Sequence, residues 1–336
     1  MKQASKPAKE EEGPQSTVDI CLGFVALSAL FLVIVLLSLF LVIGSLQHPA
    51  TIGLLVALPY YTYTLLLRRD ELGHGNHWPE FSRNNLLLSV MRRYLRLQIQ
   101  KPIPPELVTL DAQPNAQLLL AVFPHGSYSD YRVIMDGILH EVLPNLATHI
   151  RTLAASSLFR IPLAREIALW TGCVDASRHV AERQLQQGRS LLILPGGEQE
   201  QIRTRNGREE VYVQKRMGFI KLALRYKIPV VPVYVFGASD MYHTSDVALD
   251  LRLALVKQLG IAIPLAVGKW GWPLCPINVK TTIVFGKPMD MTCKEPGNPT
   301  DEEVQAKHKE FVNALVQLFD DNKTALGYGD RTLEIG

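Results

Sequence analysis

Residues 118–130 read LLLAVFPHGSYSD, an apolar run that stops at a proline and is followed by a short polar turn. The run 118–123 is too short for a confident helix and is bounded by turn-forming residues, so it predicts a buried strand. His125 comes just after the end of that strand, at the rim of the expected sheet, where α/β proteins commonly build their sites. The sequence therefore puts His125 first among the residues to consider for function.

Asp130 follows His125 by five residues. If a helix begins near Ser127 or Ser129, the Asp130 carboxylate can fold back toward the imidazole, fix its tautomer and leave the other ring nitrogen free to accept a proton. That arrangement indicates a general base. In the structural alternative, His125 ends a strand and Asp130 caps a helix, as Asp, Ser and Asn often do. The spacing alone leaves both interpretations open.

Composition sets the broad class of the protein. The chain has 336 residues and a formal net charge of +3, which suggests neither a nucleic-acid partner nor an acidic tail. Four cysteines are scattered without a C-x-x-C pair, and we interpret them as reduced thiols of a cytosol-facing protein: Cys21, Cys173, Cys275 and Cys293.

The N-terminal part predicts a tail and a membrane hairpin. Residues 1–17 mix both charge signs with Pro, Gly and Ser and predict a disordered tail. Residues 18–67 hold two apolar segments, 20–46 and 51–67, and the first is long enough to cross a bilayer core of about 30 Å. The second is barely long enough and contains Pro59, so two full spans and a re-entrant hairpin are both open. Basic residues flank the hairpin but not its link, which predicts that both ends are cytosolic.

Residues 68–110 predict a linker with a basic amphipathic helix, residues 86–99, lying on the membrane surface. His74 and His77 fall in the polar loop before that helix. No further ligands accompany them at a familiar spacing, so we interpret both as solvated loop histidines and not as a metal site.

Residues 111–336 predict one cytosol-facing α/β domain, because short apolar runs alternate with longer periodic ones. The expected strands are 118–123, 152–155, 190–194, 230–236 and 281–285. The expected helices include 178–187, 215–226 and one capped by Thr300, with acids in its first turn. Residues 251–274 are apolar, and either an insertion that touches lipid or a covered loop would fit them.

A second polar turn, PGGEQE at residues 195–200, follows the expected strand 190–194. Gly196 and Gly197 allow close backbone approach to a ligand and can turn amides toward an oxyanion, while Glu198 or Glu200 can hydrogen-bond a hydroxyl. A simple loop with solvated acids is the alternative. Six basic residues follow and fit either the phosphates of a carrier such as coenzyme A or a solvated helix face: Arg203, Arg205, Arg208, Lys215, Arg216 and Lys221.

These motifs, taken in order, resemble the type-2 diacylglycerol acyltransferase family, which also holds monoacylglycerol and wax-alcohol acyltransferases. The family's H-P-H-G turn corresponds to FPHG at 123–126, its G-G-x-x-E element to GGEQE at 196–200, and its R-K-G-F block to RMGF at 216–219. The stretches 152–178 and 318–330 fit as well. Phe123 replaces the first histidine of the turn, so the resemblance leaves a single histidine there.

The resemblance implies a glycerolipid-acyltransferase-like α/β sheet covered by helices. It implies that His125 takes the proton from an acceptor hydroxyl as that oxygen attacks the thioester of acyl-CoA, that Asp130 orients the ring, and that Glu200 matches the family's acid. No metal or cofactor beyond acyl-CoA as co-substrate is expected. The expected substrate-binding residues are Pro124, Gly126, Gly196, Gly197, Arg216 and Gly218.

The turn PGGEQE carries two acids and no arginine, which favours a neutral lipid acceptor, diacylglycerol first, over a phosphorylated one. A monoacylglycerol, a wax alcohol or a lysophospholipid is the alternative acceptor, and a non-enzymatic membrane lipid binder is the alternative class. No G-x-S-x-G elbow supports a serine hydrolase. The family implies the endoplasmic reticulum membrane, with lipid droplets as a second location, and the sequence allows a homo-oligomer.

Overall fold

The computed structural model describes residues 15–336 apart from 260, 261, 263, 274 and 296. Residues 1–14 of the expected tail lie outside the described residues. The last residues of that tail are ordered: Gln15 donates from its side-chain amide to the backbone oxygen of Arg93 over 2.8 Å, and helix α1 (Thr17–Gln47) begins at Thr17.

A seven-stranded mixed sheet forms the centre, in the order β1-β10-β7-β2-β5-β3-β4. β2 (Leu119–Phe123) lies between β5 (Ser190–Ile193) and β7 (Val230–Phe236) and is parallel to both. All residues of these three strands are buried, which explains their unbroken apolar runs. The carboxyl ends of these parallel strands therefore meet at one edge of the sheet, which we call the carboxyl edge.

The remaining strands extend the sheet on both sides. β3 (Ile150–Ala154) and β4 (Cys173–Asp175) continue the parallel part, whereas β10 (Thr282–Phe285) runs antiparallel to β7 and pairs with β1 (Gln98–Ile99). The five expected strands are confirmed to within two residues at each end. Strands of two or three residues were not expected, including the pairs formed by β6 (Glu209–Val211) with β11 (Leu333–Ile335) and by β8 (His243–Thr244) with β9 (Ala266–Val267).

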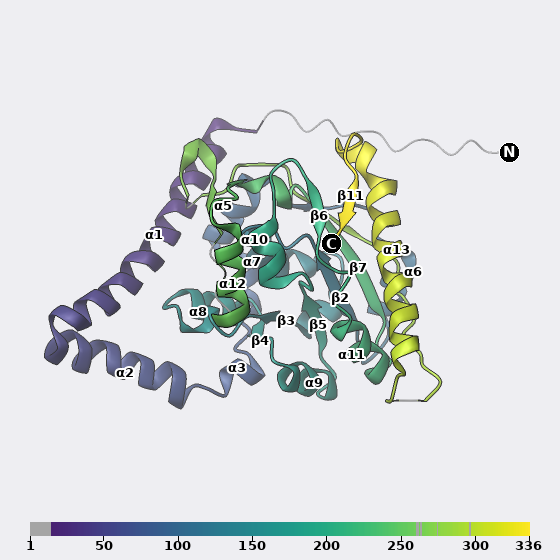
Figure 1. The fold of residues 1–336 in the computed structure, drawn as a ribbon, viewed down its shortest axis with the longest axis horizontal. Coiled ribbons are helices and arrows are strands. Elements are labelled where there is room, and N and C mark those ends of the chain that lie inside the picture. The colour runs from purple at the N-terminus through teal and green to yellow at the C-terminus, as the bar shows by residue number, and fades with distance from the viewer. Residues whose placement is uncertain (1–14, 260–261, 263, 274, 296) are drawn as a thin grey trace.

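Helices cover both faces of the sheet (Figure 1). Leu120 and Val122 of β2 pack with α5 (Leu86–Tyr94) and α7 (Asp130–Leu139) on one face. Alternate residues of β2 face the other way, toward α9 (Arg178–Gln186), α11 (Gly218–Tyr226) and α13 (Asp301–Leu326). The Thr300 cap is confirmed as a capping box with Glu303. The other α-helices of the domain are α3 (Glu71–His74), α4 (Pro79–Asn84), α6 (Pro105–Asp111), α8 (Ala164–Trp170), α10 (Gly197–Arg203) and α12 (Leu249–Leu259).

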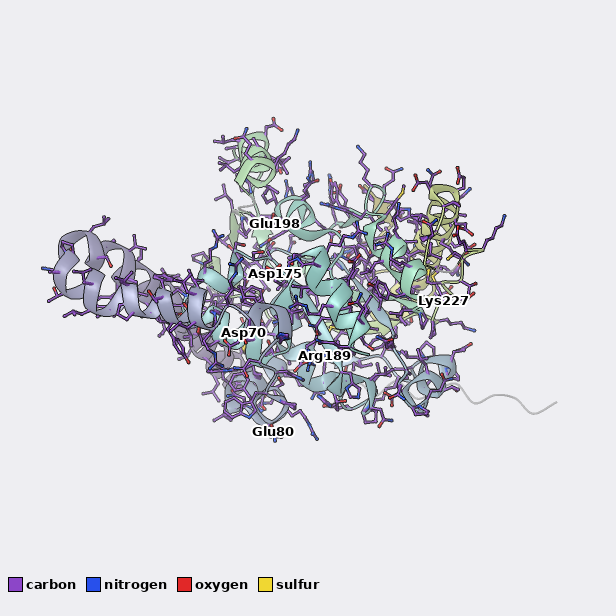
Figure 2. The ribbon with its side chains drawn as sticks, turned by 90° about the horizontal axis from the view of Figure 1, so that it is seen from below. Asp70, Glu80, Asp175, Arg189, Glu198 and Lys227 are labelled. Atoms are coloured by element: carbon purple, nitrogen blue, oxygen red, sulfur yellow. The ribbon has the colours of Figure 1, made fainter. Side chains whose placement is uncertain are left out.

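The two apolar N-terminal segments form a hairpin that projects from the domain (Figures 1 and 2). Its first arm is α1, and its second arm, Pro49–Leu67, contains the short helix α2 (Leu58–Tyr61) between two π-helical stretches. Both arms are long and apolar enough to cross a membrane. The 31 residues of α1 span about 46 Å.

Both ends of the hairpin are anchored to the same domain. Asp19 pairs with Arg93 over 3.1 Å at the start of α1. Arg165 of α8 is buried; it pairs with Glu71 over 2.7 Å and donates to the backbone oxygen of Arg68, just past the end of the second arm. The hairpin therefore returns to the side from which it leaves.

Two expectations for residues 68–110 are corrected. The expected basic helix ends at Tyr94, and Leu88, Met91 and Tyr94 of its apolar face are buried in the domain core, so these three side chains are not available to lipid. His77 is not a solvated loop residue either. Only 4% of its side chain is exposed, and its Nε2 lies 2.9 Å from Asp136 Oδ2 of α7, so the polar loop folds beneath that helix.

Candidate functional site

The two polar turns expected from the sequence meet at the carboxyl edge. His125 follows β2, and the turn that leads into α10 follows the neighbouring strand β5. Glu200 of α10 folds back across the gap, where one carboxylate oxygen accepts a hydrogen bond from the backbone N–H of His125 and the other accepts one from the backbone N–H of Tyr212 over 2.7 Å. Glu200 is buried, and it fixes the position of the His125 backbone.

The hydrogen bonds of the His125 ring define its tautomer. Nδ1 lies 3.0 Å from the Gly126 backbone oxygen and 2.8 Å from Ser129 Oγ. A carbonyl oxygen can only accept, so Nδ1 carries the proton and donates it. Ser129 Oγ can accept from Nδ1 because its own proton goes to the His125 backbone oxygen, 2.7 Å away. This tautomer leaves the lone pair of Nε2 available to accept a proton.

Asp130 takes a different place from the one expected. Helix α7 begins at Asp130, directly after Ser129, as the spacing predicts. The buried Asp130 carboxylate accepts a hydrogen bond from the Tyr242 hydroxyl, and its Oδ2 has no hydrogen-bond partner among the described residues. No hydrogen bond joins it to His125 within the part of the chain that the structure describes. Ser129 and the Gly126 backbone hold the imidazole where the carboxylate was expected to do so.

Two glycines are required by close packing at the site. Gly126 has φ +70°, and a Cβ there would lie 3.2 Å from the backbone oxygen of Ala238. A Cβ at Gly196 would lie 2.1 Å from Glu200 Oε2, so a side chain at Gly196 would displace Glu200 from its two backbone partners. Both glycines therefore serve the shape of the turns.

Burial shifts the protonation equilibria of the three central side chains. It lowers the pKa of His125 below its usual 6.5, which keeps the imidazole neutral near pH 7. It raises the pKa of Asp130 to about 6 and that of Glu200 to about 7. The backbone N–H groups of His125 and Tyr212 and the charge of Arg216 lower the pKa of Glu200 and so partly offset the effect of burial.

The other expected substrate-binding residues lie around these turns. The Tyr131 hydroxyl donates to the Pro124 backbone oxygen over 2.7 Å, and the Gly197 amide donates to the Leu194 backbone oxygen over 3.1 Å, so that amide is already engaged. Arg216 donates to the Gly196 backbone oxygen over 3.4 Å. Gly218 begins α11, in open space.

The expected basic run does not form one patch. The Arg203 guanidinium lies 4.8 Å from the centre of the Tyr212 ring, Arg205 pairs with Asp246, and Lys221 lies 3.1 Å from Asp301. Of this run, Arg216 is the residue that contacts the turn at 195–200.

A pocket of about 290 Å³ lies between α9 and α11 on one face of the sheet. Its floor is apolar and includes Leu119, Ile193 and Leu222, while Arg178, Lys221 and Arg225 line it as well. Gly218, two residues after Arg216, forms part of its wall. The pocket therefore combines an apolar interior, which suits a hydrocarbon chain, with cationic groups that also pair with the acids Glu182 and Asp301.

The sequence does not predict the contacts that three further residues make with His125, Glu200 and Asp130: Ser129, Tyr212 and Tyr242. Tyr212 contributes a backbone N–H, which no side-chain pattern can reveal. Ser129 has φ +55°, a conformation that L residues adopt rarely and that directs its hydroxyl back over His125. Its position in the turn was the one available signal, and we interpreted it only as a helix start.

Comparison with known proteins shows that the chain is similar to a set of acyltransferases. A family model described as diacylglycerol acyltransferase matches residues 51–335. Diacylglycerol O-acyltransferase 2 of Dictyostelium discoideum is 29% identical over 289 residues, which cover 80% of this chain and 83% of that protein. The 2-acylglycerol O-acyltransferase 3 of Homo sapiens is 27% identical over 286 residues and 80% of each chain. Acyl-CoA wax alcohol acyltransferase 2 of Mus musculus is 26% identical over 326 residues, 91% of this chain and 92% of that protein.

Proposed function

Since the chain belongs to the diacylglycerol acyltransferase family, we propose that it transfers a fatty acyl group from acyl-CoA to the free hydroxyl of diacylglycerol and so forms triacylglycerol. His125 acts as the general base, and the transfer uses no metal or cofactor beyond the co-substrate. The domain adopts a glycerolipid-acyltransferase-like arrangement, in which the catalytic histidine follows a central strand of a helix-covered sheet.

The observation that carries this proposal is the set of hydrogen-bond partners of His125 Nδ1, from which the tautomer of the ring follows. With its proton on Nδ1, held by the Gly126 backbone oxygen and Ser129, the imidazole presents the lone pair of Nε2 to an acceptor hydroxyl. Nε2 takes the hydroxyl proton as the oxygen attacks the thioester carbonyl. The imidazolium then returns that proton to the departing thiolate, so the products are the new ester and coenzyme A.

Glu200 serves this reaction as a positioning residue, because both of its oxygens are engaged by backbone N–H groups. General-base assistance is worth about 10²- to 10⁴-fold in rate, and holding the two substrates together supplies the rest. Asp130 contributes through Tyr242 and the shape of the turn, so its contribution is smaller than that of the groups on the ring.

We assign the acyl-CoA to the side of the carboxyl edge marked by Arg216 and the pocket between α9 and α11. Arg216 offers a cation to a phosphate next to the Gly196 turn. The apolar floor of the pocket fits a hydrocarbon or pantetheine chain.

The acceptor approaches from the membrane side, where the hairpin is anchored. The apolar hairpin supports the proposal that the protein resides in a membrane. Membership of the family supports three further proposals: location in the endoplasmic reticulum membrane, a catalytic domain that faces the cytosol, and a second location on lipid droplets. Relatives named for 2-acylglycerol and for wax alcohol align over similar lengths at similar identity, so a monoacylglycerol or a long-chain alcohol is the second candidate acceptor.

The test is product analysis with purified protein in lipid nanodiscs. Radiolabelled oleoyl-CoA is offered with diacylglycerol, monoacylglycerol, a long-chain alcohol or a lysophospholipid, one acceptor at a time. We expect triacylglycerol to form with the highest kcat/KM. A higher kcat/KM for another acceptor would identify that acceptor as the substrate. If no acceptor yields a labelled ester, the protein is a non-enzymatic lipid binder.

A further inference from the structure

The described residues of the segment 245–272, which we call the cover segment, expose apolar side chains to an unusual extent. The segment contains helix α12, strand β9 and the 3₁₀ turn Lys269–Gly271. Trp270 is 68% exposed and Trp272 39% exposed. A soluble surface seldom gathers large apolar side chains so densely. The exposed set in this segment is Val247, Leu251, Leu265, Val267, Trp270 and Trp272.

The cover segment lies over the catalytic turns. Helix α12 packs against α10, the helix that carries Glu200 (Figure 1). At the other turn, the hydroxyl of Tyr128 lies 3.4 Å from the backbone oxygen of Pro264. The Tyr128 ring also stacks edge to face on Tyr242, with the ring centres 4.9 Å apart. The cover segment therefore contacts both turns that surround His125.

The same segment continues the apolar surface of the hairpin. The Trp270 ring packs on Phe24 of α1, with centroids 4.7 Å apart, and Val25 on the next position of α1 is 63% exposed. The Lys269 ammonium lies 5.5 Å from the centre of the Trp270 ring. Tryptophan beside lysine is the pairing that proteins place at the boundary between lipid tails and headgroups.

We propose that the cover segment is a second membrane-contacting surface, and that its tryptophans, with the first turns of α1, admit the neutral acceptor from the bilayer to His125. The occupant of this surface is the lipid bilayer itself. Continuity with α1 argues for this occupant, because a surface that packs on a membrane-embedded helix meets the same lipids. The acceptor route rests on the proposed function, whereas the membrane contact does not.

The contact is tested by fluorescence, without any need for turnover. The full chain carries two other tryptophans, Trp78 and Trp170, which are first replaced by Phe so that the emission comes from Trp270 and Trp272. The protein is reconstituted in nanodiscs that contain either ordinary or chain-brominated phosphatidylcholine. We expect the brominated lipid to quench most of the emission. Unquenched emission would overturn the membrane contact, including the case in which a second copy of the chain covers the surface.

The acceptor route is tested by comparing two diacylglycerols. In the double variant Trp270→Ser/Trp272→Ser we expect kcat/KM for membrane-borne dioleoylglycerol to fall about tenfold, while that for water-soluble dioctanoylglycerol stays within about twofold. The conservative variant Trp270→Phe/Trp272→Phe should restore most of the dioleoylglycerol activity. Equal losses for both acceptors, or no loss for either, would overturn the route. Absence of any acyl transfer by the wild type would instead refute the proposed function and leave the quenching result standing.

Discussion

Replacing Ser129 by Ala isolates the group that orients the catalytic imidazole. The Ser129 hydroxyl accepts from Nδ1 over 2.8 Å and donates to the His125 backbone oxygen over 2.7 Å, so the variant loses two hydrogen bonds. At about 0.5 to 1 kcal/mol net for each bond, the loss is about 1 to 2 kcal/mol, or about 5- to 30-fold in kcat. The Gly126 backbone oxygen still accepts from Nδ1, so the fall should be smaller than for His125→Ala.

The assay is steady-state esterification of diacylglycerol with labelled oleoyl-CoA in nanodiscs. Because Ser129 has φ +55°, Ser129→Gly is the matched control, since it removes the same hydroxyl and relaxes the backbone. We expect both variants to lose kcat to a similar extent with the KM for acyl-CoA unchanged. Full activity in both would refute the orienting role, and recovery in Gly alone would assign the loss to backbone strain. Asp130→Asn, which can still accept from Tyr242, should lose less than Ser129→Ala, and a larger loss would restore the carboxylate as the orienting group.

Three further variants test separate parts of the site. Burial raises the pKa of Glu200 to about 7, so Glu200 loses its charge as the pH falls through 7 and wild-type kcat should decline there. The variant Glu200→Gln should have a lower kcat that does not decline over this range. A variant with the same pH profile as the wild type would contradict the assignment. Since the folded pKa is raised, burial of Glu200 also makes the wild-type fold less stable as the pH rises from 4.5 to 7, a dependence that thermal melts of Glu200→Gln should lack. Gly196→Ala, whose Cβ would overlap Glu200, should lower kcat about as far as Glu200→Gln does, and wild-type kcat would show that Glu200 can move without consequence. Leu222→Trp fills the pocket between α9 and α11 and should raise the KM for oleoyl-CoA about tenfold with the KM for diacylglycerol unchanged; an unaltered acyl-CoA KM would place the thioester elsewhere.

The sequence predicts the sheet well because its central strands are buried on both faces. The run that became β2 is apolar without interruption, and β5 and β7 follow the same rule, so all three were expected. Their turns meet because adjacent parallel strands end at one edge of the sheet. β4 has three residues, too few to produce a hydrophobic pattern of its own. The apolar face of α5 has the same sequence pattern whether it packs against lipid or against protein.

The hydrogen bonds of the site could not be predicted from spacing. The position of Asp130 suggested a carboxylate on the imidazole, but the αL conformation of Ser129 brings a hydroxyl to Nδ1 instead. Glu200 was expected to bind a hydroxyl, but its carboxylate accepts from two backbone amides, that of His125, 75 residues away in the sequence, and that of Tyr212, 12 residues away. His77 was expected in solvent, because the sequence of a polar loop does not show that the loop packs against a helix, here through the contact of His77 with Asp136.

The central claim is that Nε2 of His125 takes the proton of the acceptor hydroxyl, and the most direct test is triacylglycerol formation by His125→Ala. The variant is compared with wild type in the same nanodiscs, after its thermal melt has shown that it is folded. We expect kcat to fall by about 10²- to 10⁴-fold while the KM values for both substrates change little. Wild-type kcat in a folded His125→Ala protein would contradict the claim.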